Sequence, residues 1–465
     1  MSNLVFPEQF VWGTATASYQ IEGGAREGGR APSIWDAVCQ SPGRVLNGDT
    51  GDVACDHFHR FKEDVAIMKS LGLKAYRLSL AWPRIIPAGF GDVNEQGIAF
   101  YSELIDTLLD AGITPWVTLY HWDLPLVLQT EFDGLVNPDF PDWFAAYADV
   151  CFDRFGDRVK NWITLNEPWC SAVLGYGIGV HAPCRKRDTA EAYQAAHQLL
   201  RGHGRAVEIY RNKHQGKATG GGAIGITNNC DWREPLTDSA ADKAAAQRSL
   251  EFFLGWFADP VYKGDYPQVM REMVGDRLPT FTDEDKAMLK GSSDFFGLNH
   301  YTTMLASEPT GEIAERNIAG NGGISEDQNV TLTEDPKWSK TDMDWNVVPW
   351  GSAKLLKWID ERYDHPPIYV TENGCAYDVP VVDGVCDDQQ RLDFFKGYLT
   401  AMHGAISDGV DLRGYFAWSF MDNFEWAWGY TKRFGLVHTD YVTQKRTVKN
   451  SMKWYSAVIQ SNAIK

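Results

Sequence analysis

The sequence predicts an α/β fold, a single (β/α)8 TIM barrel with long βα-loop insertions, and three observations support this prediction. Short apolar runs rich in β-branched and aromatic residues alternate with helix-like stretches along all 465 residues. The runs number eight and are nearly continuous, which is typical of parallel strands buried on both faces. No Ser/Pro linker or low-complexity block divides the chain, so residues 1–465 are expected to form one catalytic domain. An open doubly wound sheet is the alternative, but the GxGxxG fingerprint it can carry is missing.

The predicted strands share an apolar interior and end in polar or aromatic residues. They span residues 10–18, 74–82, 114–122, 159–167, 223–230, 294–302, 367–373 and 412–420.

Helix-like segments lie between these strands. In residues 56–72 (DHFHRFKEDVAIMKSLG), Asp56 is expected to cap the helix and Gly72 to end it. Residues 96–112 and 390–409 show the same kind of pattern. The longest insertion, residues 303–345, is polar and contains several glycines, so we expect a functional or disordered loop.

Composition excludes several classes of partner. The formal charge of −18, from 44 basic and 62 acidic residues, repels phosphate backbones and anionic lipid, so no nucleic acid is expected. No apolar run is long enough to cross a membrane, and no segment resembles a secretory signal, so we expect a cytoplasmic protein. The eight cysteines are scattered without a CxxC pair and are expected to be reduced, structural thiols.

Polar and aromatic residues gather at the predicted carboxyl ends of the strands, where the chemistry of a barrel is located. Amides, one imidazole, carboxylates and indoles suit an uncharged, polyhydroxylated ring, because the polar groups bind hydroxyls and an indole covers a sugar face. The residues are Gln20, Glu22, Arg77, His121, Trp122, Asn166, Glu167, Asn299, Tyr301, Glu372, Trp418, Glu425 and Trp426.

Two glutamates on opposite walls of such a site indicate glycoside hydrolysis, which needs one acid and one base or nucleophile. The acid must stay protonated and the nucleophile ionised. Arg77 and Tyr301 are the donors available to stabilise an anion, so we assign Glu372 as nucleophile and Glu167 as acid/base. Strand order alone leaves the reverse assignment open, and Arg77 alone could equally form a structural salt bridge.

Several motifs resemble those of glycoside hydrolase family 1, nearly end to end. The motifs are FVWGTATASYQIEG, YRLSLAWPRIIPAG, TLYHWDLP, TLNEP, VTENG and WSFMDNFEW. The chain resembles in particular a β-glucosidase of the fungal intracellular, single-domain type. The resemblance implies a retaining mechanism, with Glu167 of TLNEP as acid/base and Glu372 of VTENG as nucleophile. The chain departs from the family pattern at Asn299-His300-Tyr301, where His300 has no expected role.

The resemblance also implies roles for the surrounding residues. Asn166 would bind the sugar 2-hydroxyl, Tyr301 would orient Glu372, and Trp345 would stack on the leaving group. Trp169 and Leu174 are expected at the entrance, where their bulk would weaken glucose binding. The implied substrate-binding set is Gln20, His121, Trp122, Asn166, Asn299, Trp345, Trp418, Glu425 and Trp426.

The leading hypothesis is therefore a retaining β-glucosidase acting on cellobiose, short oligosaccharides and aryl β-glucosides, with transglycosylation as a variant. Glu167 argues against a thioglucosidase, and Glu425 argues against a phosphorylated glycone. We expect no metal and no cofactor, while a homo-oligomer and the choice among glucose, galactose and fucose stay open. The rival hypothesis is a non-catalytic sugar-binding protein on a degenerate barrel, which would be expected to lose one glutamate.

Overall fold

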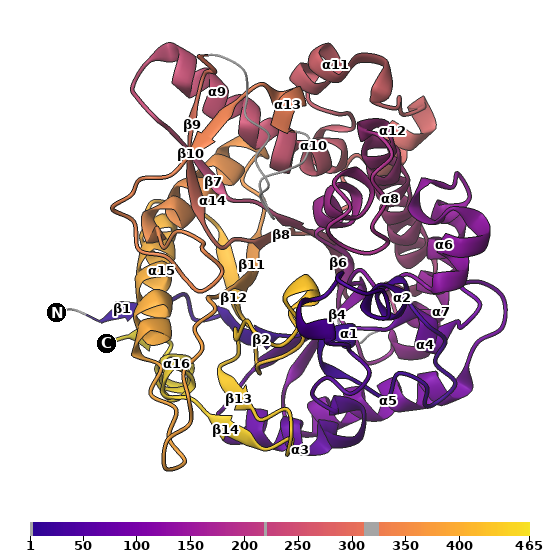
Figure 1. Ribbon diagram of the computed structural model, residues 1–465, viewed down its shortest axis with the longest axis vertical. Coiled ribbons are helices and arrows are strands. Elements are labelled where there is room, and N and C mark those ends of the chain that lie inside the picture. The colour runs from indigo at the N-terminus through magenta and orange to yellow at the C-terminus, as the bar shows by residue number, and fades with distance from the viewer. Residues whose placement is uncertain (1–2, 218–220, 311–324) are drawn as a thin grey trace.

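Eight parallel strands close into a barrel in the computed structural model, which describes residues 3–217, 221–310 and 325–465 (Figure 1). The predicted fold class and all eight predicted strands are confirmed. In barrel order the strands are β11 (Ile368–Asn373), β12 (Leu412–Trp418), β2 (Val11–Ala15), β3 (Ala75–Ser79), β4 (Thr114–Tyr120), β5 (Asn161–Asn166), β6 (Ala223–Asn229) and β8 (Phe296–Asn299).

Apolar side chains fill the interior of the barrel. Trp116 of β4 lies 5.2 Å from the ring of Phe416 and 5.5 Å from that of Phe295, measured between ring centroids. Ile163 and Ala75 complete this layer, and all five side chains are buried. The barrel is therefore solid below the carboxyl ends of its strands, which leaves only that end for a site.

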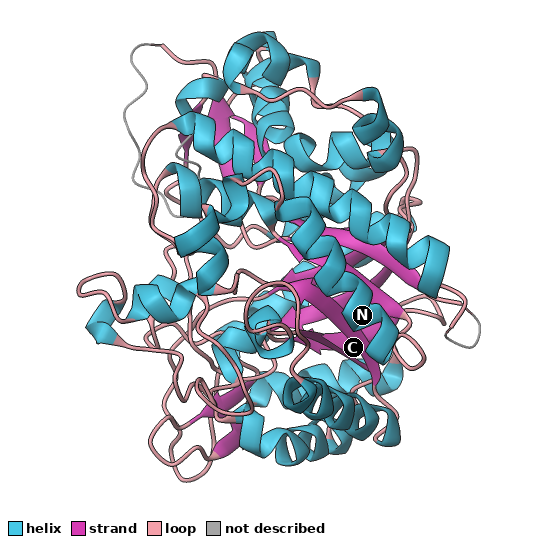
Figure 2. Ribbon diagram, turned by 90° about the vertical axis from the view of Figure 1, so that its right-hand side faces the viewer, coloured by secondary structure: helices cyan, strands magenta, loops and turns pink. Residues whose placement is uncertain are grey.

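Helices surround the barrel on its outer face (Figures 1 and 2). The longer ones are α3 (His57–Ser70), α5 (Glu95–Asp110), α7 (Phe140–Phe155), α8 (Thr189–Ile209), α9 (Ala240–Leu250), α14 (Pro349–Arg362), α15 (Gln389–Ser407) and α16 (Asn450–Ser461). Shorter ones lie in the connections and include α1 (Ser18–Ile21), α2 (Ile34–Cys39), α4 (Trp82–Ile85), α6 (Leu126–Phe132), α10 (Trp256–Lys263), α11 (Gln268–Val274) and α12 (Asp283–Leu289).

The helix predicted over residues 56–72 is present as α3, but the predicted cap is wrong. Asp56 has a φ of 52° and its side chain makes no capping hydrogen bond to the backbone of α3. Its carboxylate instead lies 2.6 Å from His59 Nδ1 and accepts a bond from Arg60 Nε at 3.1 Å, so side chains one turn ahead satisfy it. Gly72 follows the helix with a φ of 73°, as expected for a terminating glycine. Helices α5 and α15 confirm the other two predictions.

Part of the insertion over residues 303–345, for which a functional or disordered loop is expected, has regular structure, so disorder is wrong for that part. Strands β9 (Thr303–Ser307) and β10 (Thr331–Thr333) pair antiparallel, and β9 also pairs with β7 (Trp232–Pro235). A short helix, α13 (Ser325–Gln328), precedes β10. Strands of three to five residues carry too little periodicity for the sequence to reveal them. The Gly-bearing residues 311–324 of this insertion lie outside the described residues.

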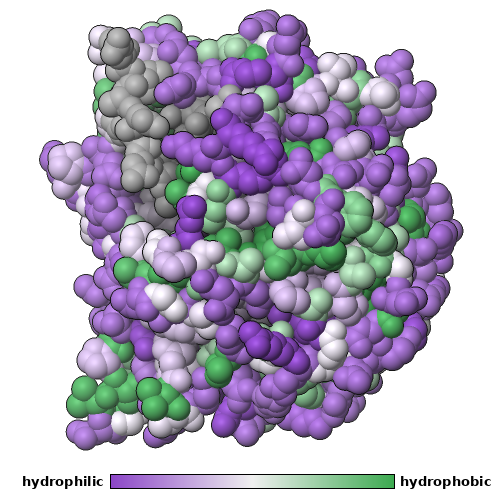
Figure 3. All heavy atoms as spheres, turned by 45° about the vertical axis from the view of Figure 1, so that its right-hand side comes forward, coloured by the Kyte–Doolittle hydropathy of each residue, from purple (hydrophilic) through white to green (hydrophobic). Residues whose placement is uncertain are grey.

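The two ends of the described chain meet beside the barrel, where β1 (Leu4–Val5) pairs antiparallel with β15 (Ala463–Ile464) (Figure 1). Hydrophilic residues dominate the face shown in Figure 3, and hydrophobic ones gather mainly in a band across its middle. Within the described ranges, no helix combines the length and apolar character needed to span a membrane. All eight cysteines are free thiols, and only Cys184 is more than slightly exposed.

Gly374 lies where the ends of β11 and β12 approach each other closely. A Cβ added at Gly374, directly after β11, would collide with the backbone carbonyl oxygen of Trp418 at the end of β12. Gly374→Ala is therefore expected to lower the free energy of unfolding by about 1–3 kcal/mol, because neither backbone segment can move freely. Gly404→Ala is the matched control, since a Cβ there meets nothing within 4 Å on an exposed face of α15. It should instead raise stability by ~0.5–1 kcal/mol. Equal unfolding midpoints for the two variants in urea would contradict this account.

Candidate active site

The carboxylate of Glu372 lies at the end of β11, buried at 3% exposure, and is held by two donors. Arg77 Nη1, from β3, donates a hydrogen bond to Oε1. Tyr301 OH, from the segment after β8, donates to Oε2 at 2.6 Å. A cation and a phenol therefore face the two oxygens of one carboxylate, an arrangement that favours its ionised form.

Two amides connect this carboxylate to the second glutamate. Arg77 Nη2 donates to Asn166 Oδ1 at 2.5 Å. Asn299 Nδ2 donates to the same oxygen at 3.0 Å and to Glu167 Oε1 at 2.6 Å. Thr371 Oγ1 in turn donates to Asn299 Oδ1 at 2.8 Å, which fixes the orientation of the amide. The two glutamates are thus joined by a continuous hydrogen-bonded network across the barrel.

Local backbone structure places Glu167 at the point where β5 ends. Its φ of 47° lies in the left-handed region, which a non-glycine residue adopts only when its surroundings hold it there. The amide N–H donates to Thr227 of the neighbouring strand at 2.9 Å, and the carbonyl accepts from Cys170 N at 2.9 Å. Pro168 follows, and the chain then turns into the π-helical segment η3 (Cys170–Gly177). The strand end is therefore bent so that the Glu167 side chain turns to the network.

The two carboxyl groups have unequal electrostatic surroundings. Burial, and then the nearby charge of Glu372, raise the pKa of Glu167 to about 8. Burial also raises the pKa of Glu372, but Arg77, Tyr301 and Asn299 oppose that rise. Because Arg77 contacts Glu372 directly, these surroundings favour the negative charge on Glu372 and the proton on Glu167.

An aromatic wall lies beside Asn166. The imidazole of His121 stacks within 13° of the Trp418 ring at 5.9 Å and within 15° of the Trp426 ring at 6.0 Å. Trp122 lies 4.6 Å from Trp426, and its indole N–H donates to the Asn166 carbonyl at 2.9 Å. Burial, and then Arg77, hold the pKa of His121 well below its usual range, so the ring is neutral. Its Nε2 lies 3.1 Å from Asn166 Nδ2, which assigns Nε2 as acceptor and leaves the proton on Nδ1.

A second set of hydrogen bonds orients Gln20 of α1. Gln20 Nε2 donates to Asn423 Oδ1 at 3.1 Å and to the Phe424 carbonyl at 2.8 Å. Asn423 uses its own amide N–H groups on Ser419 Oγ, at 2.7 Å, and on the Met421 carbonyl, at 2.9 Å. Both donors of Gln20 are therefore engaged, which leaves Oε1 as the atom that can accept from a ligand.

The remaining predicted residues lie around this centre. The ring of Trp345 lies 5.1 Å from that of Tyr301. Burial, and then the charges of Glu372 and Glu167, raise the pKa of Glu425 to about 8. Trp169 and Leu174, in the segment that follows Glu167, are each 3% exposed, and Trp169 packs edge-on against Phe253 at 4.4 Å.

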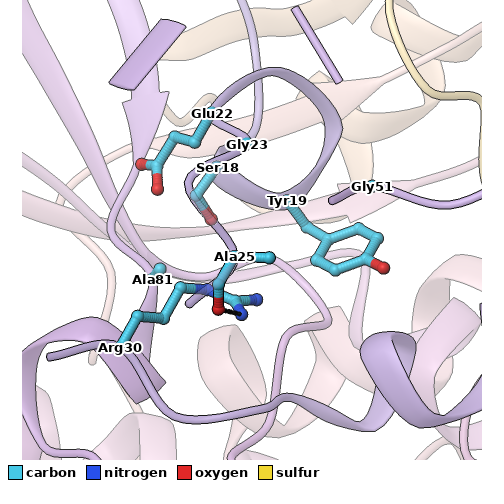
Figure 4. Close-up of a pocket in the computed structure, with 8 residues that line it drawn as sticks. All are labelled: Ser18, Tyr19, Glu22, Gly23, Ala25, Arg30, Gly51 and Ala81. Carbon is cyan, nitrogen blue, oxygen red and sulfur yellow. Dashed lines mark hydrogen bonds between the residues drawn. The ribbon is translucent and has the colours of Figure 1, made fainter. Parts of the chain in front are cut away.

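Two residues near the strand ends do not point to this centre. The expectation that Glu22 belongs to the polar tips is wrong, because its carboxylate accepts from Arg84 Nε at 3.2 Å and Tyr101 OH at 2.6 Å. Glu22 lines a separate cavity of about 10 Å³, in which Figure 4 shows Glu22 and Arg30 on opposite sides of Ser18. The Nδ1 of His300 lies 2.9 Å from the backbone carbonyl oxygen of Cys230, so this nitrogen is engaged by the main chain and not by either glutamate.

Sequence reasoning missed three residues of this centre, namely Thr371, Asn423 and Cys170. Cys170 Sγ donates to Glu167 Oε2 at 3.1 Å. Each of the three lies within three residues of a predicted site residue, in VTENG, WSFMDNFEW or the WC pair after TLNEP. Their position in these motifs was the available signal. The sequence does not indicate, however, which residue of another segment a short polar side chain will bond.

The parallel barrel contains two glutamates joined by hydrogen bonds and a lining of amides and indoles that suits a sugar. These features define the class of the protein, the glycoside hydrolases. Comparison with known proteins agrees: the profile of glycosyl hydrolase family 1 matches residues 2–464. The chain is 48% identical over 467 residues to "Beta-glucosidase 42" of Arabidopsis thaliana, which covers 98% of this chain and 94% of that protein.

Solved structures give the same result. A family 1 β-glucosidase from Thermotoga maritima matches with a TM-score of 0.92 and 46% identity over 100% of both chains. A structure of a β-glucosidase from that organism in complex with glucoimidazole matches with a TM-score of 0.91 and 46% identity, covering 99% of this chain and 100% of that one. The chain therefore belongs to glycosyl hydrolase family 1.

The raised pKa of Glu425 predicts a pH-dependent cost to stability. A carboxyl whose pKa is higher when folded holds protons that the unfolded chain releases, so stability falls as pH rises from about 4.5 towards 8. Glu425→Gln removes this effect and should raise the melting temperature at pH 8 but not at pH 4. The expected gain is a few degrees, on the order of 1 °C for each kcal/mol in a chain of 465 residues. Calorimetry at both pH values checks this, and the exposed Glu103→Gln serves as control. A gain of equal size at both pH values would show that the charge is not its cause.

Proposed function

We propose that the protein is a retaining β-glucosidase that removes terminal non-reducing β-D-glucosyl residues by double displacement. The observation that carries the proposal is the network Glu372–Arg77–Asn166–Asn299–Glu167, in which one carboxyl has a cation as partner and the other has neutral donors. A retaining glycosidase needs this asymmetry, because one carboxylate attacks while the other supplies and then removes a proton.

In the first step, Glu372 attacks the anomeric carbon while Glu167 gives its proton to the departing glycosidic oxygen. Arg77 and Tyr301 keep the nucleophile ionised and in place. In the second step, the ionised Glu167 takes a proton from water, which attacks the glycosyl–enzyme and releases the β-anomer. Replacement of this water by a sugar hydroxyl gives transglycosylation at the same site.

The glycone would be held by Gln20, His121, Asn166, Asn299, Glu425 and Trp426, with Trp418 beneath the ring and Trp122 supporting the wall. Asn166 would bind the 2-hydroxyl, while Gln20 Oε1 and His121 Nδ1–H supply an acceptor and a donor. The complex of the Thermotoga maritima β-glucosidase with glucoimidazole supports a glucose-shaped ligand for this chain as well. Two carboxyl groups beside this region, Glu425 and Glu372, disfavour a phosphorylated sugar.

The leaving group would stack on Trp345, whose contact with Tyr301 places it next to the nucleophile. Trp169 and Leu174 would narrow the entrance and limit inhibition by glucose. The substrates proposed are cellobiose, short oligosaccharides and aryl β-glucosides, which suits the last step of cellulose degradation. Eight free cysteines support a reducing compartment, the cytosol.

Proton NMR of p-nitrophenyl β-D-glucoside hydrolysis tests the mechanism. β-Glucose should appear first and mutarotate afterwards, because two inversions give net retention. Glu372→Gln should lower kcat by ~10³-fold or more, and Glu167→Gln by ~10²–10⁴-fold for poor leaving groups. The exposed Glu103→Gln should retain wild-type activity. Initial α-glucose would refute the double displacement, and an inactive wild type would refute the proposed function.

A comparison of glucosides with their 6-phosphates tests the choice of glycone. We expect kcat/KM to be at least ~10²-fold lower for the 6-phosphate, since like charges in a buried site repel strongly. The ratio should widen as the pH rises through about 8, where Glu425 ionises, and Glu425→Gln should remove this pH dependence. Faster cleavage of the phosphorylated substrate by the wild type would exclude the assignment.

A further inference from the structure

A thiol contacts the carboxyl group of Glu167. Cys170 lies one turn after Glu167, at the first residue of η3, and the backbone N–H of Cys170 donates to the Glu167 carbonyl at 2.9 Å. This turn brings Cys170 Sγ to 3.1 Å from Glu167 Oε2. Both side chains are 6% exposed, so the contact is shielded from bulk water.

The two oxygens of Glu167 have partners of different kinds. Oε1 accepts from Asn299 Nδ2 at 2.6 Å, and an amide N–H can only donate. A proton on Oε1 would compete with this bond, so the acidic proton belongs on Oε2. Oε2 is the oxygen that faces the thiol.

A thiol can serve both protonation states of its neighbour, because sulfur accepts weakly and S–H donates weakly. Asn229 Nδ2 donates to Cys170 Sγ at 3.4 Å, which occupies one side of the sulfur and directs its S–H at Glu167. We propose that Cys170 is a positioning residue for the acid/base: it accepts from Oε2–H while Glu167 is the acid and donates S–H to Oε2 once the proton has left. This role rests on the proposed function, in which Glu167 must pass through both states in every cycle.

A weak donor suits this position. A strong donor at Oε2 would stabilise the carboxylate and leave too little of the protonated acid at neutral pH. An apolar residue would leave the carboxylate without a second partner and make the base harder to form. Burial, and then the charge of Glu167, raise the pKa of Cys170 well above its usual range, so the thiol keeps its proton.

The charged and titratable groups around this pair are the same in every Cys170 variant. Glu372 and Arg77 act on Glu167, and so does Glu425, whose pKa of about 8 lies in the tested range. Asp231 acts on Cys170 together with Glu167 and Glu372. Because Glu425 is the same in Cys170→Ser and Cys170→Ala, its titration does not produce shifts of opposite sign. The remaining groups line a cavity of about 10 Å³ beside Cys170 and do not titrate between pH 5 and 9. They are His181, whose pKa burial lowers to about 4, and Tyr120, whose pKa burial raises well above its usual value.

The test compares Cys170→Ser with Cys170→Ala in the alkaline limb of kcat/KM against pH. Because the serine hydroxyl donates more strongly, Cys170→Ser should move the limb down by about 0.5 pH unit or more. Cys170→Ala removes the donor and should move the limb up by a similar amount. Shifts of the alkaline limb in opposite directions in the two variants support the proposal. No shift, or a shift in the same direction in both variants, would overturn it.

Two additions separate this proposal from the proposed function and from a packing effect. Titration of ¹³C-labelled glutamate carboxyl groups by NMR reads the Glu167 pKa in each variant without turnover, with Glu167→Gln identifying the signal. It should show the same opposite shifts even where an assay fails. Cys184→Ser, a half-buried cysteine of another loop, should leave the pKa unchanged. Wild-type hydrolysis in the same assay tests the proposed function separately, and failure of the shifts alone overturns only the role of Cys170.

Discussion

The guanidinium of Arg77, which is fully buried in the barrel, constrains the polar groups around it. A buried cation is tolerated only where paired and hydrogen-bonded, so β3 requires an anion from β11 and an acceptor from β5. Glu372 and Asn166 supply them. Because strands set these positions rather than loops, the groups proposed to perform the chemistry are held by the most rigid part of the fold.

This pairing also makes the electrostatic surroundings of the two glutamates unequal, on which their proposed roles depend. Arg77 stabilises the negative charge of Glu372, and that charge then opposes a second one on Glu167 or Glu425. In the proposed mechanism, Glu167 therefore keeps its proton as the acid because Glu372, the nucleophile, has lost its own. These features lower the free energy of unfolding, since buried carboxyl groups and a left-handed backbone at Glu167 are unfavourable in a folded chain.

The strands and the two glutamates could be predicted from the sequence because each is a local signal: a continuous apolar run, or a carboxylate at its end. The roles of Glu22, Asp56 and Cys170 could not. Glu22 and Asp56 are satisfied by Arg84 and Arg60 rather than by the partners that their local patterns indicate. The contact of Cys170 depends on the π-helical turn of η3, for which the sequence has no recognised signature. Short strands such as β10 gain their stability from pairing alone, which periodicity cannot show.

The central claim is that Glu372, held by Arg77, is the ionised nucleophile. The most direct measurement is to trap the glycosyl–enzyme with a 2-deoxy-2-fluoro-β-glucoside bearing a dinitrophenolate leaving group, and to locate the sugar by peptide mass spectrometry. The fluorine slows the second step, and the good leaving group makes the first step independent of the acid. The account predicts a glucosylated peptide that contains Glu372. A sugar on Glu167, or an inactivated enzyme without a covalent adduct, would contradict it.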